Sequence, residues 1–176
     1  SLQRRVGIIT TGRSWSDTVE AFADLGVSDD QLAANGIEIM KIAFVFLFFA
    51  SSMQAFVSGL DEVLVIEECR AFLEPQVKDV VFNMPEGRRP LILGKRNNSG
   101  EEWFASHGEL TPATIARVLY RWLEPFHRTE TMSGWIGYLN QVDAALAVPR
   151  DNVIRTPFFC SGCPHNSSTV APEGSI

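Results

Sequence analysis

The segment Leu-Asp-Glu-Val-Leu-Val-Ile-Glu-Glu, residues 60–68, decides the fold class of this chain. Its centre, residues 63–66, is apolar at every position, so a strand formed there would be apolar on both faces. Such a strand lies in the middle of a parallel sheet whose two faces are covered by helices. The segment therefore predicts an α/β domain, and its neighbours supply the other elements that such a domain needs.

Three further strands and three helices are expected around this segment. The strands are short apolar runs at residues 6–11, 37–44 and 91–93. The first helix is expected to follow Ser14 as its N-cap, with an apolar stripe of Trp15, Val19, Phe22 and Ala23. A crossover helix is expected at 53–57, and another beginning near Pro75 with Val77, Val80 and Val81 facing the core. Strands that alternate with helices in this way predict a mostly parallel sheet.

The last third of the chain begins with the clearest helix signal. Thr111 is the expected N-cap and Pro112 the first helical residue, and the apolar face that follows consists of Ile115, Val118, Leu119 and Trp122. A second amphipathic helix is predicted from Trp135, Leu139, Val142 and Leu146, ending near Pro149. Residues 155–176 are rich in Pro, Gly, Ser and Asn and are predicted to form a loop.

Composition restricts the classes of function. Hydrophobic residues make up 45%, charged residues 20% and the net charge is −6, which is typical of a globular protein and unfavourable for binding nucleic acid. The apolar run at 42–50 has about half the length of a membrane-spanning helix and is expected to be a buried strand with an apolar extension. The chain opens on Arg4 and Arg5 without a secretory signal, and its three cysteines form no disulfide framework, so a cytoplasmic location is expected.

The sharpest chemical signal is Cys160-Ser-Gly-Cys163, followed by Pro164, His165 and Asn166. Two cysteines at this spacing can bind one zinc ion or one iron–sulfur centre, although a complete site needs about four ligands. Within this chain His165 is the nearest additional ligand. A redox dithiol is a second possibility, which the proline after Cys163 disfavours. For the chain alone, two reduced thiols in a flexible tail are the favoured interpretation.

Two other groups of polar residues could form a site. Glu67 and Glu68 follow the central strand, where ligands of open α/β sheets collect, so they could act as a general acid or as a charge partner. The favoured interpretation is a cap on the next helix plus a salt bridge. Residues 94–100 resemble a phosphate loop but lack its spacing, so a solvated turn is expected. His107 and His127 are isolated, and no catalytic residue is assigned.

Three segments, in order, resemble the middle of indolepyruvate ferredoxin oxidoreductases, a family of thiamine-diphosphate-dependent 2-oxoacid:ferredoxin oxidoreductases. They are VGIITTG at 6–12, LDEVLVIEE at 60–68 continuing as RAFLE at 70–74, and FCSGCPHNSST at 159–169 with PEGS at 172–175. The segment GELTP at 108–112 fits the same pattern. The resemblance covers nearly the whole chain and implies an internal fragment of a longer enzyme. Cys69 departs from the pattern, since the family commonly has lysine after its paired glutamates.

The resemblance implies a fold and a domain division. Residues 1–126 would be a three-layer α/β/α domain similar to the transketolase C-terminal domain, residues 127–159 a helical linker, and residues 160–176 the truncated start of the pyrophosphate-binding domain. In the full protein, Cys160 and Cys163 would be candidate iron–sulfur ligands, and His165 and Asn166 would lie near the thiamine site.

The resemblance also implies the reaction of the parent enzyme. An arylpyruvate would be oxidatively decarboxylated to an acyl-CoA, with thiamine diphosphate, magnesium and [4Fe–4S] clusters as cofactors and with ferredoxin and coenzyme A as partners. A homodimer is favoured, without nucleic-acid or membrane partners. The chain itself is expected to bind no cofactor and to be a catalytically inactive structural domain. The alternatives are a stand-alone α/β interaction module and a small metal-binding protein that uses Cys160, Cys163 and His165.

Overall fold

The computed structural model describes residues 5–46, 50–125, 127–147 and 158–174. These residues belong to two units, residues 1–142 and residues 143–176, and each is treated by itself. The first unit contains the sheet and the helices that pack on it. The second contains the end of helix α6 and the short C-terminal helix α7.

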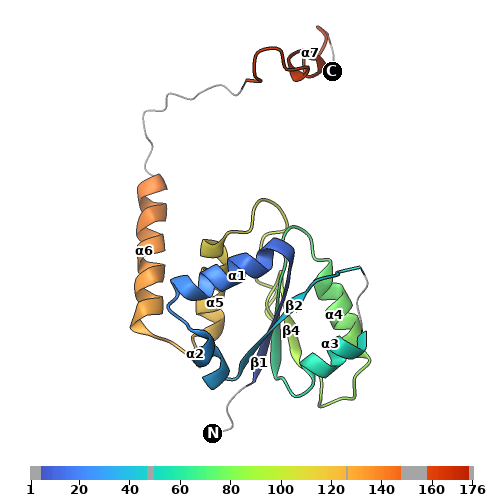
Figure 1. Cartoon of the computed structure of the whole chain (residues 1–176), viewed down its shortest axis with the longest axis vertical. Coiled ribbons are helices and arrows are strands. Elements are labelled where there is room, and N and C mark those ends of the chain that lie inside the picture. Colours follow the sequence, from blue (N-terminus) through green and yellow to red (C-terminus); the bar gives the residue numbers. More distant parts are fainter. Residues whose placement is uncertain (1–4, 47–49, 126, 148–157, 175–176) are drawn as a thin grey trace. The chain divides into compact units, whose positions relative to one another are not determined.

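A four-stranded parallel sheet forms the centre of the first unit (Figure 1). Its strands are β1 (Val6–Thr11), β2 (Ile37–Ile42), β3 (Glu62–Ile66) and β4 (Leu91–Leu93), in the order β2-β1-β3-β4. In register, Ile8 of β1 lies opposite Ile39 of β2 and Leu64 of β3. Every residue of β3 is buried, as the apolar segment predicted. The expected α/β class with a parallel sheet is therefore confirmed.

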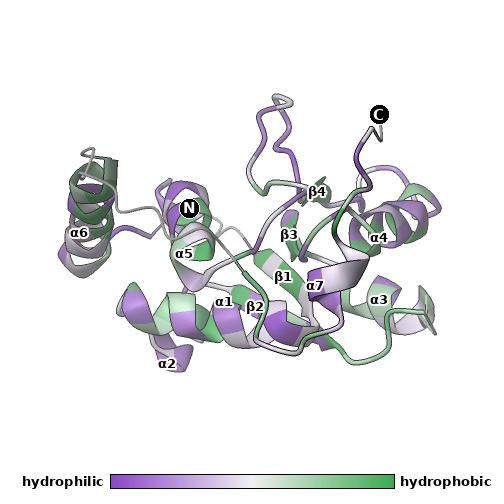
Figure 2. Cartoon of the chain, turned by 90° about the horizontal axis from the view of Figure 1, so that it is seen from above, coloured by the Kyte–Doolittle hydropathy of each residue, from purple (hydrophilic) through white to green (hydrophobic). Residues whose placement is uncertain are grey.

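Helices cover both faces of the sheet. The helices of the first unit are α1 (Gly12–Asp24), α2 (Asp29–Ala34), α3 (Ala50–Val57), α4 (Leu73–Phe82), α5 (Pro112–Leu123) and α6 (Glu130–Ala147), whose end belongs to the second unit. The second unit also contains α7 (His165–Ser168). Ile8 packs in a core beneath α1 and α5, whereas its neighbour Ile9 packs in a second core beneath α3 and α4. Figure 2 shows the hydrophobic strands β1 and β3 between these two helical layers. The three-layer arrangement follows from this alternation of side chains.

Helix α5 forms as its sequence predicts. Thr111 is the N-cap and its hydroxyl accepts the backbone N–H of Thr114 at 3.2 Å. Pro112 is the first helical residue, where its missing N–H removes no intrahelical bond. The four apolar positions of the expected face are all buried: Ile115, Val118, Leu119 and Trp122.

The predicted start of the first helix was wrong, and its predicted stripe was right only in part, since Phe22 is buried and Trp15 half-buried. Helix α1 begins at Gly12, directly after β1, with Thr11 as its N-cap. The Thr11 hydroxyl caps no helical N–H and instead donates to the backbone oxygen of Ile42 at 2.8 Å. Gly12 has a φ of 53°, a conformation that turns the chain and suits glycine. The buried face lies beside the predicted stripe and shares only Phe22 with it, so Val19 is 48% exposed and Ala23 is exposed. The buried face is instead formed by Ser14, Asp17, Thr18, Ala21 and Phe22.

The second strand is shorter than predicted. Strand β2 ends at Ile42, which lies opposite Thr11, the last residue of β1. Beyond that point β1 offers no partner, and the side chains of Phe44 and Phe46 are 74% and 88% exposed. The prediction that the apolar run 42–50 is a buried strand with an extension is therefore wrong for residues 43–46. Residues 47–49 lie outside the described residues.

The last helices differ in part from the prediction. In α6, Leu139 is buried and Trp135 half-buried, whereas Leu146 is 66% exposed. The expected C-terminal loop contains a short helix, α7, while residues 155–157 and 175–176 lie outside the described part. No helix among the described residues has the length and apolar character needed to span a membrane.

Candidate functional site

The carboxyl ends of β1 and β3 form the place where an open α/β sheet usually binds ligands. The chain leaves β1 toward β2 on one side and leaves β3 toward β4 on the other, so the connections diverge between these two strands. Ligands of such sheets bind in the crevice at this point. The residues that the chain supplies here are 11–13 after β1 and 67–69 after β3. Two of the sequence candidates, Glu67 and Glu68, lie at this edge.

Glu67 holds the start of helix α4. Its side chain is buried, and Oε2 accepts the backbone N–H groups of Phe72 at 3.0 Å and Leu73 at 2.7 Å. Oε1 accepts the N–H of Glu74 at 3.0 Å. These donors lack partners within the helix, and a carboxylate interacts favourably with the positive end of the helix dipole. The interpretation of Glu67 as a helix cap is confirmed. Glu68 is half-buried and takes no part in this cap.

Lys95 connects the loop after β4 to the same network. Its ammonium donates to the backbone oxygen of Glu67 at 2.6 Å and to that of Ala105 at 3.3 Å. Its own backbone N–H donates to Oε2 of Glu74 at 2.9 Å. Burial lowers the pKa of Lys95, and the nearby charge of Glu67 opposes this effect. The expected solvated turn is therefore wrong for Lys95, which is only 8% exposed, although Asn98, Ser99 and Gly100 are exposed.

Gly94 is required by the position of Glu74. A Cβ at residue 94 would lie 2.5 Å from Cδ and 3.0 Å from Cγ of Glu74. The Glu74 side chain has little freedom to move, since it is buried and its Oε1 pairs with the ammonium of Lys78 at 2.5 Å. The glycine that made residues 94–100 resemble a phosphate loop thus serves internal packing.

Arg13 carries an exposed positive charge at this edge. Its guanidinium pairs with Glu109 at 2.6 Å and lies 3.5 Å from Oδ2 of Asp17. The hydrogen bond to Glu109 raises the pKa of Arg13, with smaller contributions from Asp17 and Glu68. Arg13 was not among the residues singled out from the sequence, and Lys95 was predicted only as part of a solvated turn. Both directly follow a glycine at the end of a strand, which is the signal that would have drawn attention to them.

Cys69 lies in the loop after Glu68. It is the one described residue other than glycine with a positive φ, 53°, and its thiol is exposed and free. Among the described residues, no cluster of three or more His, Cys, Asp or Glu side chains could hold a metal ion.

The C-terminal unit brings the predicted tail residues together in one turn. The N–H of Cys163 donates to the oxygen of Cys160 at 3.0 Å, and the side-chain amide of Asn166 donates to that same oxygen at 3.0 Å. Sγ of Cys163 lies 3.1 Å from Nδ1 of His165, whose ring stacks on Phe159. Two free thiols on a tight turn suit a soft metal and supply half of the usual ligand set.

The other two histidines belong to neither of these two groups of residues. His107 is exposed in the loop before α5. His127 is half-buried, and its Nε2 has no hydrogen-bond partner among the described residues. The loop of His107 also contains Ala105 and Glu109, which contact Lys95 and Arg13.

The sequence of residues 1–146 matches the family described as the Indolepyruvate oxidoreductase domain. The chain belongs to this family. Its relatives include proteins named indolepyruvate oxidoreductase subunit IorA, 28% identical in Thermococcus kodakarensis, 26% in Pyrococcus abyssi and 28% in Methanothermobacter thermautotrophicus. The matches cover 95%, 95% and 92% of this chain, respectively, but 22% of each relative. The resemblance found in the sequence is confirmed, and the chain corresponds to a domain-sized part of these longer subunits.

Proposed function

We propose that this indolepyruvate oxidoreductase domain is a structural part of a 2-oxoacid:ferredoxin oxidoreductase that acts on indolepyruvate or another arylpyruvate. The parent enzyme would carry out oxidative decarboxylation to an acyl-CoA in the cytoplasm, with ferredoxin and coenzyme A as partners. The chain would be inactive alone and would pack against the remaining domains of the parent, which would itself be a homodimer. Support comes from the family match over residues 1–146 and from relatives whose names carry this substrate.

The cap that Glu67 forms is the observation that carries the structural role. At the edge where such sheets bind ligands, the buried carboxylate accepts three backbone N–H groups of α4. Lys95 is likewise occupied by two backbone carbonyl groups. The hydrogen bonds of both side chains thus stabilise the loops and the helix start at this edge. We infer that this domain positions the neighbouring domains rather than the substrate.

We assign a different part of the parent enzyme to each of three segments of the chain. Residues 1–126 would be the domain similar to the transketolase C-terminal domain, residues 127–159 a helical connection and residues 160–176 the start of the pyrophosphate-binding domain. Thiamine diphosphate and magnesium would be bound mainly by other domains and would supply the chemistry of decarboxylation. His165 and Asn166 would lie near that site in the full protein.

Cys160 and Cys163 would supply two ligands to a [4Fe–4S] cluster of the parent enzyme. The donor chemistry fits, because thiolates are the ligands that iron–sulfur clusters prefer. Gly162 has a φ of 79°, which lets the turn between the two cysteines tighten. The further ligands would come from elsewhere in the parent enzyme.

The experiment that tests the structural role is the substitution Glu67→Gln in the protein encoded by the complete gene. A capping residue predicts a lower midpoint of thermal unfolding, with kcat and KM of the folded enzyme changed less than about twofold. A general acid or base predicts the opposite pattern, a loss of kcat of about 10²–10⁴-fold at nearly unchanged stability. The adjacent Glu68→Gln is the matched control, because Glu68 caps no helix.

A further inference from the structure

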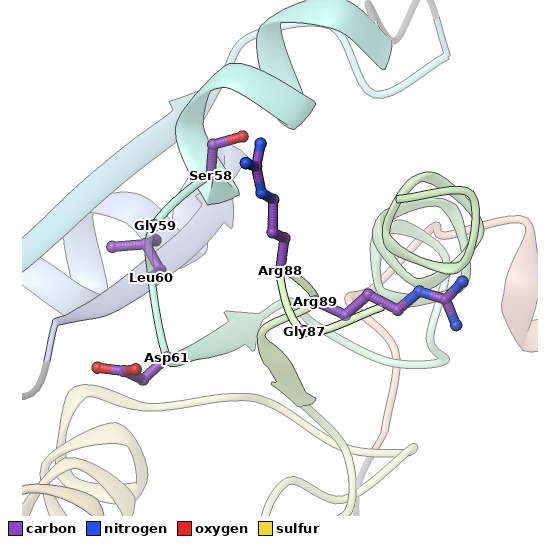
Figure 3. A pocket seen from close by; sticks show the side chains of 7 residues that line it. All are labelled: Ser58, Gly59, Leu60, Asp61, Gly87, Arg88 and Arg89. Atoms are coloured by element: carbon purple, nitrogen blue, oxygen red, sulfur yellow. The ribbon is translucent and has the colours of Figure 1, made fainter. Parts of the chain in front are cut away.

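A hollow of about 510 Å³ lies at the amino ends of β3 and β4, on the opposite edge of the sheet from Glu67. Two turns form its walls, residues 58–61 between α3 and β3 and residues 87–89 between α4 and β4 (Figure 3). Its volume falls within the range of about 300–1,000 Å³ that is typical of small-molecule sites. Neither the proposed structural role nor the family match assigns a ligand to this edge.

Arg88 brings an unpaired positive charge into this hollow. Figure 3 shows its side chain reaching from one turn toward Ser58 on the other. Most described arginines are engaged, as Arg5 is with Glu38 and Arg121 with Glu101. Within the described part of the chain, the Arg88 guanidinium has no hydrogen bond, ion pair or ring contact. Its five N–H donors are therefore available to a ligand.

The other polar side chains around the hollow are already hydrogen-bonded within the chain, so Arg88 is the side chain available to contact a ligand. Arg89 points away from the hollow, donates from Nε to the oxygen of Met84 at 2.7 Å and lies over the ring of Phe82. The Ser58 hydroxyl already donates to the oxygen of Gln54 at 2.6 Å. Asp61 accepts the N–H of Arg5 at 2.9 Å, and its carboxylate points away from Arg88.

We propose that this hollow binds the oxyanion group of a small ligand, a phosphate or a carboxylate, through the guanidinium of Arg88. A guanidinium forms paired, charge-assisted hydrogen bonds with two oxygens of such a group. The chain has a net charge of −6, so its overall field disfavours anions and an anion held here owes its binding to the local site. The C-terminal ends of α3 and α4 flank the hollow, and the helix dipole gives each of them a partial negative charge that repels an anion. The affinity for an anion should therefore depend strongly on Arg88.

The test is a titration of the 176-residue chain with inorganic phosphate, and separately with acetate, at constant ionic strength. Amide NMR shifts give both the affinity and the place of binding. We expect saturable shifts confined to residues 58–61 and 87–89. Arg88→Ala should weaken the affinity by about tenfold, as expected for the loss of hydrogen bonds between charged groups. Saturation by phosphate alone would identify the ligand group as a phosphate, and saturation by acetate alone would identify it as a carboxylate.

The matched control is Arg70→Ala. Arg70 is also exposed and without a partner among the described residues, but it follows β3 at the other edge of the sheet. Its loss should change the affinity less than twofold. Shifts in the wild-type chain that fail to saturate, or that spread over the surface, would overturn the proposal. Equal weakening by Arg70→Ala and Arg88→Ala would also overturn it, because binding would then depend only on net charge.

Discussion

Oε2 of Glu67 accepts the backbone N–H of Leu73 at 2.7 Å, and this bond joins the end of the central strand to the first residue of helix α4. Two further N–H groups complete the cap, and Lys95 donates to the backbone oxygen of the same glutamate. The edge of the sheet where ligands would be expected is thus stabilised from within. Four predictions on stability and metal binding follow from this arrangement and from the C-terminal turn.

Replacing Glu67 by Gln should destabilise the fold. The amide keeps the shape of the carboxylate but loses its charge, and one of its two ends is a donor that faces other donors. We expect the free energy of unfolding to fall by about 1.5–3 kcal/mol, the range for hydrogen bonds to a charged group. Urea denaturation of the chain measures this change. Glu68→Gln should change it by less than about 0.5 kcal/mol, and equal effects of the two substitutions would contradict the cap.

Replacing Gly94 by Ala should force Glu74 out of its position. The new Cβ would lie 2.5 Å from Cδ of Glu74, so either the side chain or the loop must move. We expect a loss of about 1–3 kcal/mol in the free energy of unfolding, as for other overpacked sites. Gly134→Ala in α6 meets no atom within 4 Å and should instead stabilise the fold by about 0.5–1 kcal/mol. A neutral Gly94→Ala would show that Glu74 is not held in place.

Replacing Lys95 by Met should remove a pH dependence of stability. Burial lowers the pKa of Lys95 in the folded chain, so between that pKa and about 10.4, the value for an exposed lysine, the unfolded chain binds more protons. This group therefore makes the free energy of unfolding rise with pH in that window. The stability advantage of the wild type over Lys95→Met should grow as the pH rises through the alkaline range.

Denaturant unfolding of both proteins at several alkaline pH values measures this difference. Both proteins should carry Cys69→Ser, because Cys69 interacts electrostatically with Lys95 and would otherwise contribute differently to the two proteins. An advantage that stays constant or shrinks with pH would show that the ammonium is not desolvated.

Replacing Cys160 or Cys163 by Ser should reduce metal binding in the protein encoded by the complete gene. If the two thiols are cluster ligands, each variant purified without oxygen should contain less iron than the wild type, since both sulfurs of the turn are needed. Cys69→Ser is the control, because it removes a free, exposed thiol that is not part of this turn and should leave the iron content unchanged. Iron and visible absorbance are the readouts. Unchanged iron in both variants would contradict the assignment.

The sequence predicted those parts of the fold that local patterns determine. Strand β3 was found because every position is apolar, and α5 because cap, proline and apolar face agree. The start of α1 was missed because Ser14 is a good N-cap in isolation, whereas the strand before it runs directly into the helix through Gly12. The end of β2 was missed because it depends on where its partner β1 ends, which the residues after Ile42 do not reveal.

The candidate site could also be predicted only in part, because some of its features depend on residues that are distant in the sequence. That Glu67 would cap a helix follows from its place between a strand and a helix start. The burial of Lys95 depends on contacts with Glu67 and Glu74, which are 28 and 21 residues away in sequence. The unpaired state of Arg88 likewise depends on which acidic side chains lie nearby, and no sequence pattern reveals that.

Sequencing the coding DNA on both sides of this segment tests the central claim most directly. The account predicts that the reading frame continues into a thiamine-diphosphate motif downstream and into another domain upstream, in line with relatives of which this chain matches 22%. Start and stop codons that closely flank the 176 codons would contradict it, because the chain would then be a stand-alone module.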